Sequence, residues 1–261
     1  MDTDAVLTLL QEVAAEYVTP RFRSLAPGEI AEKGPGDLVT VADREAESAL
    51  TRALSAAYPG AVILGEEAAS ANPGHFDAYA RAEHAFTIDP VDGTKNFVRG
   101  SADHAVMVAE LREGICVRSW IWQPRQERSY VAERGAGVWR GDHQLTRTAL
   151  TPETPPRAVT SIRTWLGIEL GPVGPLELTW VCCGIDYPQL IEGAADLIVY
   201  GGTLPWDHAP GTLMVTEAGG YVATFAGDAY DPTTRPRGLL VCGEEAIYNR
   251  VREHTHALSR R

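Results

Sequence analysis

Two short apolar runs that end in acidic residues constrain the fold of this chain most strongly. The run 61–64 leads into Gly65-Glu66-Glu67, and the run 85–88 leads into Asp89-Pro90-Val91-Asp92. Four apolar residues bounded by Gly, Pro and acids are typical of buried strands, because helices need longer periodic segments. We therefore predict two buried strands whose carboxyl ends carry carboxylates.

Two amphipathic helices are expected before these strands. Apolar residues at helical spacing cover positions 6–17, and a second periodic segment runs from Asp43, its candidate N-cap, to about Tyr58. Between the two helices, a loop rich in Gly and Pro leads into the segment 38–41. The stretch 68–84 is expected to be a mobile loop with room for one short helix.

The sequence from 105 to 139 predicts an antiparallel meander. Short β-like segments alternate there with turn residues such as Glu-Gly, Gln-Pro-Arg and Arg-Gly. The predicted strands of the meander are 106–111, 115–122 and 129–133.

The chain is expected to divide into two halves. Residues 151–157 hold three prolines, which makes them the best candidate for a boundary between an N-terminal α+β half, 1–150, and a C-terminal α/β half, 151–261. Helices are expected in the second half at 207–218 and 244–258. The whole pattern predicts helices layered against two sheets in one α+β/α-β unit.

The composition limits the class of partner. The chain has 35 Asp and Glu against 23 Lys and Arg, a formal net charge of −12, and no basic run interleaved with aromatic residues. A nucleic-acid polymer is therefore not the expected partner.

A membrane is not expected either, because no apolar run approaches the roughly 18–20 residues of a span. The acidic N-terminus is unlike a signal peptide, and four cysteines without C-x-x-C spacing favour reduced thiols, so the cytoplasm is the expected location.

The stretch from Asp89 to Thr94 is the most informative about chemistry. Its two acids lie three positions apart, around a proline that fixes φ and before a glycine that permits a tight backbone path. Both carboxylates can then converge, with the Val91 carbonyl between them, into the all-oxygen environment that Mg²⁺ prefers. The residues after Gly93 are expected to open a helix whose free N–H groups can hold a phosphate. Taken alone, the stretch is equally compatible with an ordinary strand end and glycine turn.

Three separated motifs stand out in the chain. They are Gly65-Glu66-Glu67, the run from Asp89 to Phe97, and Trp206-Asp207-His208-Ala209-Pro210-Gly211 with Glu217-Ala218-Gly219-Gly220. In order and spacing they resemble the inositol monophosphatase family, part of a Mg²⁺-dependent, lithium-sensitive phosphatase superfamily. The residues 33–43 are similar to the family's upstream motif, and the resemblance covers about residues 5–255. It implies a layered αβαβα sandwich of the inositol monophosphatase/fructose-1,6-bisphosphatase type, usually dimeric, so a homodimer is expected.

The resemblance also implies a metal site with two or three Mg²⁺ ions. Glu66, Asp89 and the Val91 carbonyl would hold one ion, and Asp89, Asp92 and Asp207 a second. A third, weaker ion would lie near Glu66. Read without the resemblance, Asp207 is equally suited to be the N-cap of the helix that follows it.

The catalytic roles are implied in the same way. Thr94 and Asp43 would take a proton from a metal-bound water, with Glu66 beside them, and the backbone amides of Gly93 and Thr94 would bind the ester phosphate. Coordination lowers the pKa of water from about 15.7 to about 7 in the best-studied zinc enzyme. No covalent enzyme intermediate is then needed. Without the resemblance, the sequence predicts only that Asp43 is a helix N-cap.

The second half of the chain departs from the family pattern. Family members that accept inositol phosphate usually carry an acid seven residues before the W-D aspartate, where this chain has Tyr200, and the usual G-[ST]-A-A is replaced by 184–187, Gly-Ile-Asp-Tyr. Both segments contact the substrate alcohol in the family. Asp186, Tyr200 and Asp207 are therefore expected to line a rebuilt substrate pocket.

The W-D-x-A-A-G motif of the family is also altered. This chain carries His208 and Pro210 within it. We expect a surface or capping role for His208, with contact to substrate or to metal-bound water as the alternative. Pro210 is expected in the first helical turn, where proline is tolerated. Trp206 is expected to serve packing, and Cys182 and Cys183 to be strand residues.

The sequence thus predicts a hydrolase, a Mg²⁺-dependent phosphomonoesterase that uses metal-activated water against a small phosphorylated alcohol. Inositol-1-phosphate, a polyol or sugar phosphate and histidinol phosphate are the candidate substrates. Two alternatives remain: a 3′(2′),5′-bisphosphate nucleotidase of the same superfamily, and a non-catalytic regulator that binds metal and a phosphate ligand. Inhibition by Li⁺ at millimolar concentrations is expected from the resemblance.

Overall fold

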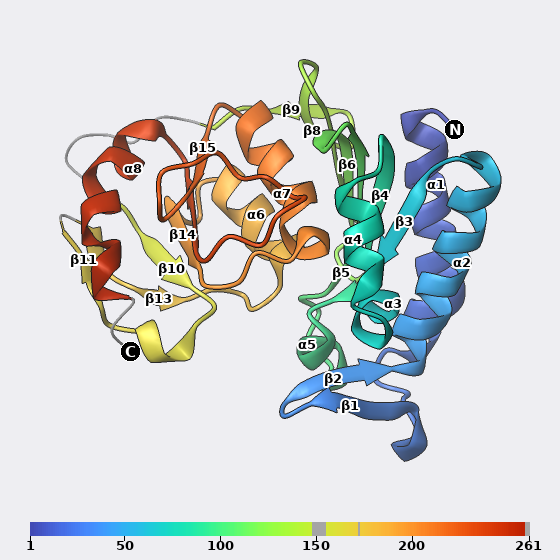
Figure 1. Ribbon diagram of the computed structural model, residues 1–261. Helices are drawn as coiled ribbons and strands as arrows, with labels where there is room; N and C mark the ends of the chain where they lie inside the picture. The colour runs from blue at the N-terminus through green and yellow to red at the C-terminus, as the bar shows by residue number, and fades with distance from the viewer. Residues whose placement is uncertain (148–154, 172, 259–261) are drawn as a thin grey trace.

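The chain forms five stacked layers of helix, sheet, helix, sheet and helix (Figure 1). The computed structural model describes residues 1–147, 155–171 and 173–258. The predicted αβαβα sandwich is confirmed. The expected boundary between halves, at 150/151, falls in the segment 148–154 and lies outside the described residues.

The first layer consists of α1 (Thr3–Val13), which continues as a π turn and a 3₁₀ turn to Arg21, and α2 (Val41–Ala57). A hairpin of β1 (Ile30–Gly34) and β2 (Asp37–Thr40) leads into α2.

The expectation that Asp43 is the N-cap of α2 is wrong. Thr40 is the N-cap, since its hydroxyl accepts from the Ala42 N–H, while Asp43 sits at the third helical position and accepts from the Thr40 N–H at 2.9 Å.

The second layer is a seven-stranded sheet with the order β3-β4-β5-β6-β7-β8-β9. In this sheet β3 and β4 are parallel and the other neighbours are antiparallel. The three predicted strands of the meander are β5, β6 and β7, and the meander continues through β8 and β9, which were not predicted. The stretch 68–84 is not a loop with one helix, because two helices cross between the parallel strands, as such a connection requires. The elements are β3 (Val62–Gly65), α3 (Glu66–Ala71), α4 (Gly74–Ala80), β4 (His84–Asp92), α5 (Thr94–Val98), β5 (Ala105–Arg112), β6 (Ile115–Gln123), β7 (Arg128–Glu133), β8 (Gly137–Arg140) and β9 (His143–Leu145).

The remaining layers are α6 with α7, a five-stranded sheet of order β13-β10-β14-β16-β15, and α8 on its outer face (Figure 1). A small hairpin, β11 with β12, stands beside that sheet. The bounds are β10 (Ala158–Thr160), β11 (Glu169–Leu170), β12 (Val173–Pro175), β13 (Glu177–Leu178), α6 (Cys183–Ile191), β14 (Leu197–Tyr200), α7 (Pro205–Glu217), β15 (Tyr221–Thr224), β16 (Leu239–Cys242) and α8 (Glu245–Val251).

Several local predictions for this half are corrected. Cys182 is the N-cap of α6 and Cys183 its first residue, so the two cysteines are not strand residues. Helix α7 begins at Pro205 with Leu204 as N-cap, which places Asp207 at the third helical position rather than at the cap. The last predicted helix is α8 followed by a 3₁₀ segment, 252–257.

Each interface between layers has its own apolar core. Trp120 and Phe86 of the large sheet are fully buried against α1 and α2, whereas Met107 faces α6 and α7. Burying one such large side chain contributes about 2–3 kcal/mol. Because β4 and β5 are covered on both faces, their central residues are buried without alternation. Among the described residues, no helix is both long and apolar enough to cross a bilayer.

Candidate active site

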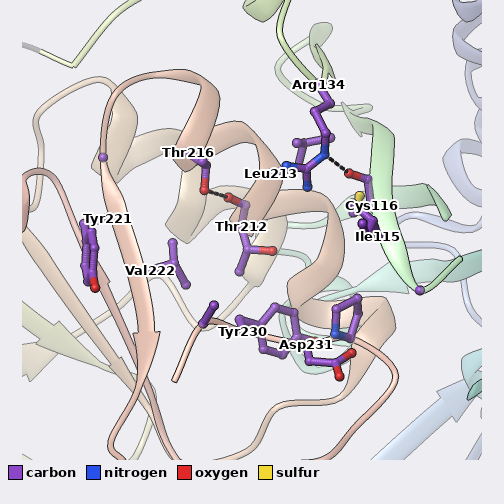
Figure 2. A pocket seen from close by; sticks show the side chains of 14 residues that line it. Ile115, Cys116, Arg134, Thr212, Leu213, Thr216, Tyr221, Val222, Tyr230 and Asp231 are labelled. Carbon is purple, nitrogen blue, oxygen red and sulfur yellow. Dashed lines mark hydrogen bonds between the residues drawn. The ribbon is translucent and has the colours of Figure 1, made fainter. Parts of the chain in front are cut away.

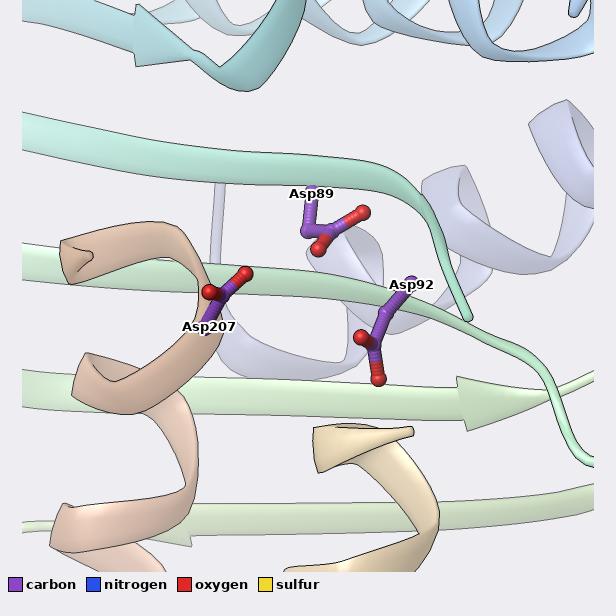
Figure 3. Close-up of side chains that lie close together, drawn as sticks. All are labelled: Asp89, Asp92 and Asp207. Carbon is purple, nitrogen blue, oxygen red and sulfur yellow. The ribbon is translucent and has the colours of Figure 1, made fainter. Parts of the chain in front are cut away.

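Three aspartates from distant parts of the chain converge between the two sheets (Figure 3). Asp89 and Asp92 end β4, Asp207 lies in the first turn of α7, and one oxygen of each is within 4.8 Å of the others. Side chains three apart on a regular strand would point to opposite faces. The pairing of β4 with β5 shifts register between Asp89 and Asp92. Because such a bulge changes the direction of a side chain, both carboxylates can point towards Asp207.

The aspartate cluster is electrostatically unfavourable without a counter-charge. Burial raises the pKa of Asp89 and of Asp207 well above the usual value, and the neighbouring carboxylates Glu66 and Asp92 raise both further. Asp89 Oδ1 is buried and has no hydrogen-bond donor among the described residues. An all-oxygen set with an unsatisfied buried carboxylate oxygen fits a divalent cation such as Mg²⁺.

Glu66, the predicted fourth acid, is paired with a lysine. It is the first residue of α3, and Lys33 Nζ from the β1–β2 hairpin lies 2.7 Å from its Oε1 and 2.8 Å from Oε1 of Glu67. Burial raises the pKa of Glu66 to about 7 although Lys33 lowers it. Lys33 is thus an internal cation at the edge of the acidic site.

Glu47, which was not predicted from the sequence, orients the start of α3. Its carboxylate accepts from the backbone N–H groups of Glu67 at 2.7 Å and Ala68 at 2.8 Å. A Cβ on Gly65 would lie 2.2 Å from the Glu47 carboxyl carbon, so glycine is required there. The sequence did contain an indication of this role, because Glu47 lies one helical turn after Asp43 on the apolar face of α2.

The predicted catalytic pair is brought together. Thr94 Oγ1 lies 3.0 Å from Asp43 Oδ1 and 3.0 Å from the Val91 carbonyl oxygen. Asp43 is fully buried, and this burial raises its pKa to about 6 even though Thr40 donates to it. The Val91 carbonyl keeps a second lone pair for another partner.

The turn before α5 brings the two halves into contact. Gly93 has φ = 80°, and a Cβ there would lie 3.0 Å from both the Asp103 carbonyl oxygen and Cys182 Cβ. Asn96 Nδ2 donates to the carbonyls of Asp103 and Trp180, each at 2.9 Å. This role of Asn96 was not predicted from the sequence, because its partner lies 84 residues away.

Asp186 and Tyr200, the predicted pocket residues, bond to each other. The Tyr200 hydroxyl donates to Asp186 Oδ2 at 3.2 Å, and the Trp180 N–H donates to Oδ1 at 3.0 Å. Burial raises the pKa of Asp186 well above the usual value, and only 1% of its surface and 3% of that of Tyr200 is exposed. Direct contact of this buried pair with a substrate stays a prediction.

The expectations for His208 and Pro210 are wrong. His208 is buried, its Nδ1 lies 2.9 Å from the Tyr187 hydroxyl, and burial lowers its pKa to about 3. The reason is that α7 lies between two sheets, which cover the side of the helix that carries His208. Pro210 is the sixth residue of α7 rather than part of its first turn, so the Trp206 carbonyl has no N–H at position i+4. The prediction that Trp206 serves packing is confirmed by its place in the core.

A separate pocket of about 480 Å³ lies along the C-terminal part of α7 (Figure 2). Thr212 and Thr216 of α7, Arg134, Tyr230 and Asp231 contribute to its lining. None of the three converging aspartates lines it. The acidic site and this pocket therefore lie at different ends of one helix.

Fold and site together define a layered α/β protein with a cluster of three aspartates between its two sheets. The model of the inositol monophosphatase family matches residues 2–260. The chain belongs to this family of metal-dependent phosphatases.

Known proteins of similar sequence and structure agree with this placement. The inositol-1-monophosphatase of Mesorhizobium japonicum is 32% identical over 233 residues, which cover 84% of this chain and 83% of the relative. The Nus factor SuhB of Escherichia coli is 28% identical over 229 residues, or 82% and 80% of the two chains. A solved IMPase/NADP phosphatase complexed with Mg²⁺ and phosphate shares the fold, with a TM-score of 0.79, 19% identity and coverage of 97% and 94%.

Proposed function

We propose that this protein is a Mg²⁺-dependent phosphomonoesterase that hydrolyses a small phosphorylated alcohol. One observation carries the proposal: Asp89, Asp92 and Asp207 converge within 4.8 Å, with a buried Asp89 oxygen that has no donor among the described residues. Thr94, which directly follows Gly93 after Asp92, also forms a hydrogen bond with Asp43 of α2. An ordinary strand end has no need for this set of groups.

The cation ligands in this proposal are the three aspartates, Glu66 and the carbonyl oxygen of Val91, for two or three ions. When bound, divalent cations lower the pKa of coordinated water and offset charge on a phosphoryl group. Mg²⁺ is the proposed ion because all these ligand atoms are oxygens, and because a protein of the same fold was solved with Mg²⁺ and phosphate.

Thr94 and Asp43 are proposed to move the proton. The Thr94 hydroxyl can pass its proton to Asp43 Oδ1, 3.0 Å away, while Thr94 Oγ1 accepts one from the attacking water. A pKa of about 6 makes Asp43 a stronger base than an exposed aspartate. The N–H groups of Gly93 and Thr94, at the start of α5, are proposed to bind the ester phosphate.

The substrate is proposed to be inositol-1-phosphate, a polyol or sugar phosphate, or histidinol phosphate. The Mesorhizobium relative, named an inositol-1-monophosphatase, supports the first. The buried pair of Asp186 and Tyr200 supports a leaving-group pocket different from the usual one. We further propose a cytoplasmic homodimer.

Two other functions are weighed against this one. A similar structure is named a dual specific IMPase/NADP phosphatase, which supports activity on a nucleotide phosphate as the second candidate. The relative named Nus factor SuhB supports a regulatory role. The convergence of Asp89, Asp92 and Asp207, together with the hydrogen-bonded pair of Thr94 and Asp43, favours catalysis over a regulator that only binds.

Phosphate release from a substrate panel tests the proposal. The panel contains inositol-1-phosphate, histidinol phosphate, fructose-1,6-bisphosphate, glycerol phosphate and 3′-phosphoadenosine 5′-phosphate, each with Mg²⁺ and with EDTA. Asp92→Asn should abolish turnover while the protein stays folded, and Asp142→Asn, at an exposed position away from the site, is the matched control. Hydrolysis that persists in EDTA or in Asp92→Asn would overturn the metal assignment.

A further inference from the structure

The thiol of Cys182 contacts the carboxylate of Asp92, and the function proposed above makes no use of this contact. Cys182 Sγ lies 2.9 Å from Asp92 Oδ2, and the backbone N–H of Gly184 donates to the same oxygen. Asp92 ends β4 of the first sheet, whereas both donors belong to the start of α6. One carboxylate oxygen of a proposed cation ligand is therefore held by the other half of the molecule.

The backbone before Cys182 adopts an unusual conformation. Val181 has φ = 58°, in the left-handed region that β-branched residues rarely adopt. Cys182 follows with an extended backbone, φ = −159° and ψ = 115°, and α6 begins directly afterwards. Such outliers persist only where surrounding contacts over-determine them.

Three hydrogen bonds hold this turn in place. Thr179 Oγ1 accepts from the Val181 N–H at 3.0 Å, and Asp186 Oδ1 accepts from the Trp180 N–H at 3.0 Å. From the other half, Asn96 Nδ2 donates to the Trp180 carbonyl at 2.9 Å. The strained turn is thus secured from both sides, and it sets the direction of the Cys182 side chain.

Two glycines allow the halves to approach closely at this point. A Cβ on Gly93 would lie 3.0 Å from Cys182 Cβ, and a Cβ on Gly184 would lie 2.4 Å from that of Ala105. Cys182 and Asp92 are both buried as a result. The distance between thiol and carboxylate is therefore determined by backbone packing rather than by flexible side chains.

We propose that Cys182 is a positioning residue for the cation site. Its S–H donates to Asp92 Oδ2 and, together with the Gly184 N–H, holds the carboxylate in the orientation that binds a divalent cation. The inference rests on the proposed function, in which Asp92 is a Mg²⁺ ligand. Cys242 offers the contrast, since it is equally buried but lies among apolar residues of the second sheet.

Mg²⁺ binding by the purified full-length protein, measured by calorimetry without substrate, tests the role of Cys182. Removing an outer-sphere partner of a metal ligand typically costs about 10–100-fold in affinity. Cys182→Ala should weaken Mg²⁺ binding by about tenfold, while Cys182→Ser, which keeps a donor, should stay within about threefold of the wild type. Cys242→Ala is the matched control and should bind as the wild type does.

The thermal midpoint in EDTA separates positioning from packing. A merely structural thiol would lower this midpoint in the Ala and Ser variants without changing their Mg²⁺ affinity. If Cys182→Ala does not fold, Cys182→Val, which fills the space without a donor, is compared with Cys182→Ser instead. Equal Mg²⁺ affinity in the donor-free variant and the wild type, or in the donor-free variant and Cys182→Ser, would overturn the inference.

The two proposals fail in distinguishable ways. If the wild type binds Mg²⁺ and hydrolyses a substrate of the panel while Cys182→Ala binds Mg²⁺ equally well, only the role of Cys182 is wrong. If the wild type itself does not bind Mg²⁺, the cation site fails and the role of Cys182 with it.

Discussion

The Thr94 hydroxyl lies 3.0 Å from Oδ1 of Asp43, a residue 51 positions earlier in the chain. Asp43 belongs to the first turn of α2 and Thr94 to the first turn of α5, so two helix starts meet at this hydrogen bond. Asp43 is fully buried, and burial raises its pKa to about 6. A buried carboxylate beside a hydroxyl is a suitable proton acceptor at neutral pH.

Asp43→Asn is expected to lower kcat by about 10²–10⁴-fold with little change in KM, because a positioned base contributes that much. Thr94→Val should have a comparable effect, whereas Thr94→Ser, which keeps the hydroxyl, should retain most activity. Steady-state kinetics on the preferred substrate measure this. A kcat for Asp43→Asn within about threefold of the wild type would exclude Asp43 as the base.

The metal-free protein is expected to lose stability as the pH rises from about 4 to about 7. Burial raises the pKa of Asp43 to about 6, that of Glu66 to about 7 and that of Asp89 well above the usual value. Burial lowers the pKa of His84, His104 and His208, which acts in the opposite direction. The raised carboxyl groups outnumber these histidines, because they comprise Asp43, Glu47, Glu66, Asp89, Asp92, Asp186 and Asp207. The folded protein therefore binds more protons than the unfolded chain in this window, so the free energy of unfolding falls with rising pH, by an amount on the order of a few kcal/mol.

Thermal midpoints in EDTA across this pH range check the direction of the change. Asp89→Asn removes one of the carboxyl groups with a raised pKa, so its thermal midpoint should change less with pH. Addition of Mg²⁺ at pH 7 should restore the thermal midpoint of the wild type. A wild-type midpoint that rises with pH more steeply than that of Asp89→Asn would contradict the prediction.

Gly65→Ala is expected to destabilise the protein by about 1–3 kcal/mol, the usual cost of overpacking. Its Cβ would lie 2.2 Å from the Glu47 carboxyl carbon, and Glu47 cannot move without losing the N–H groups of Glu67 and Ala68. Chemical denaturation measures the loss. Gly60→Ala is the control, since no atom lies within 4 Å of its added Cβ; equal stabilities of the two variants would contradict this packing.

The double variant Tyr200→Glu with Asp186→Ala is expected to shift preference towards polyol phosphates. It restores the acid and the alanine usual in family members that accept inositol phosphate. Tyr200→Glu alone should instead destabilise the protein, because its carboxylate would be buried next to Asp186.

The substrate preference of the double variant is measured as the ratio of kcat/KM for inositol-1-phosphate to kcat/KM for histidinol phosphate. A rise of about tenfold in the double variant is expected, since hydrogen-bonded recognition of a hydroxyl discriminates at least that strongly. Asp186→Ala is the control for the loss of the buried pair. An unchanged ratio would mean that positions 186 and 200 do not form the pocket wall.

Much of the site could be predicted because its residues lie in short local motifs. The acids Asp89 and Asp92 follow a buried run of four residues, and Glu66 directly follows the parallel strand β3, which ends at Gly65. Strand and helix periodicity also predicted the meander and the layering on two sheets. These features depend on neighbours only a few positions away in the chain.

The partners of these groups could not be predicted in the same way. Lys33 with Glu66, Glu47 with the start of α3, and Cys182 with Asp92 are contacts between elements 20 to 90 residues apart. His208 was expected to have a surface or capping role, and it is buried because α7 lies between two sheets.

Local patterns in the sequence thus predicted the first two helices, the meander, the strand ends that carry acids and the family to which the chain belongs. Which carboxylates are buried together, which donors hold them and which polar residues are shielded from solvent depend instead on how the elements pack. The physical reason is that periodicity and turn chemistry act over a few residues, whereas desolvation and charge interaction depend on every element packed against a group.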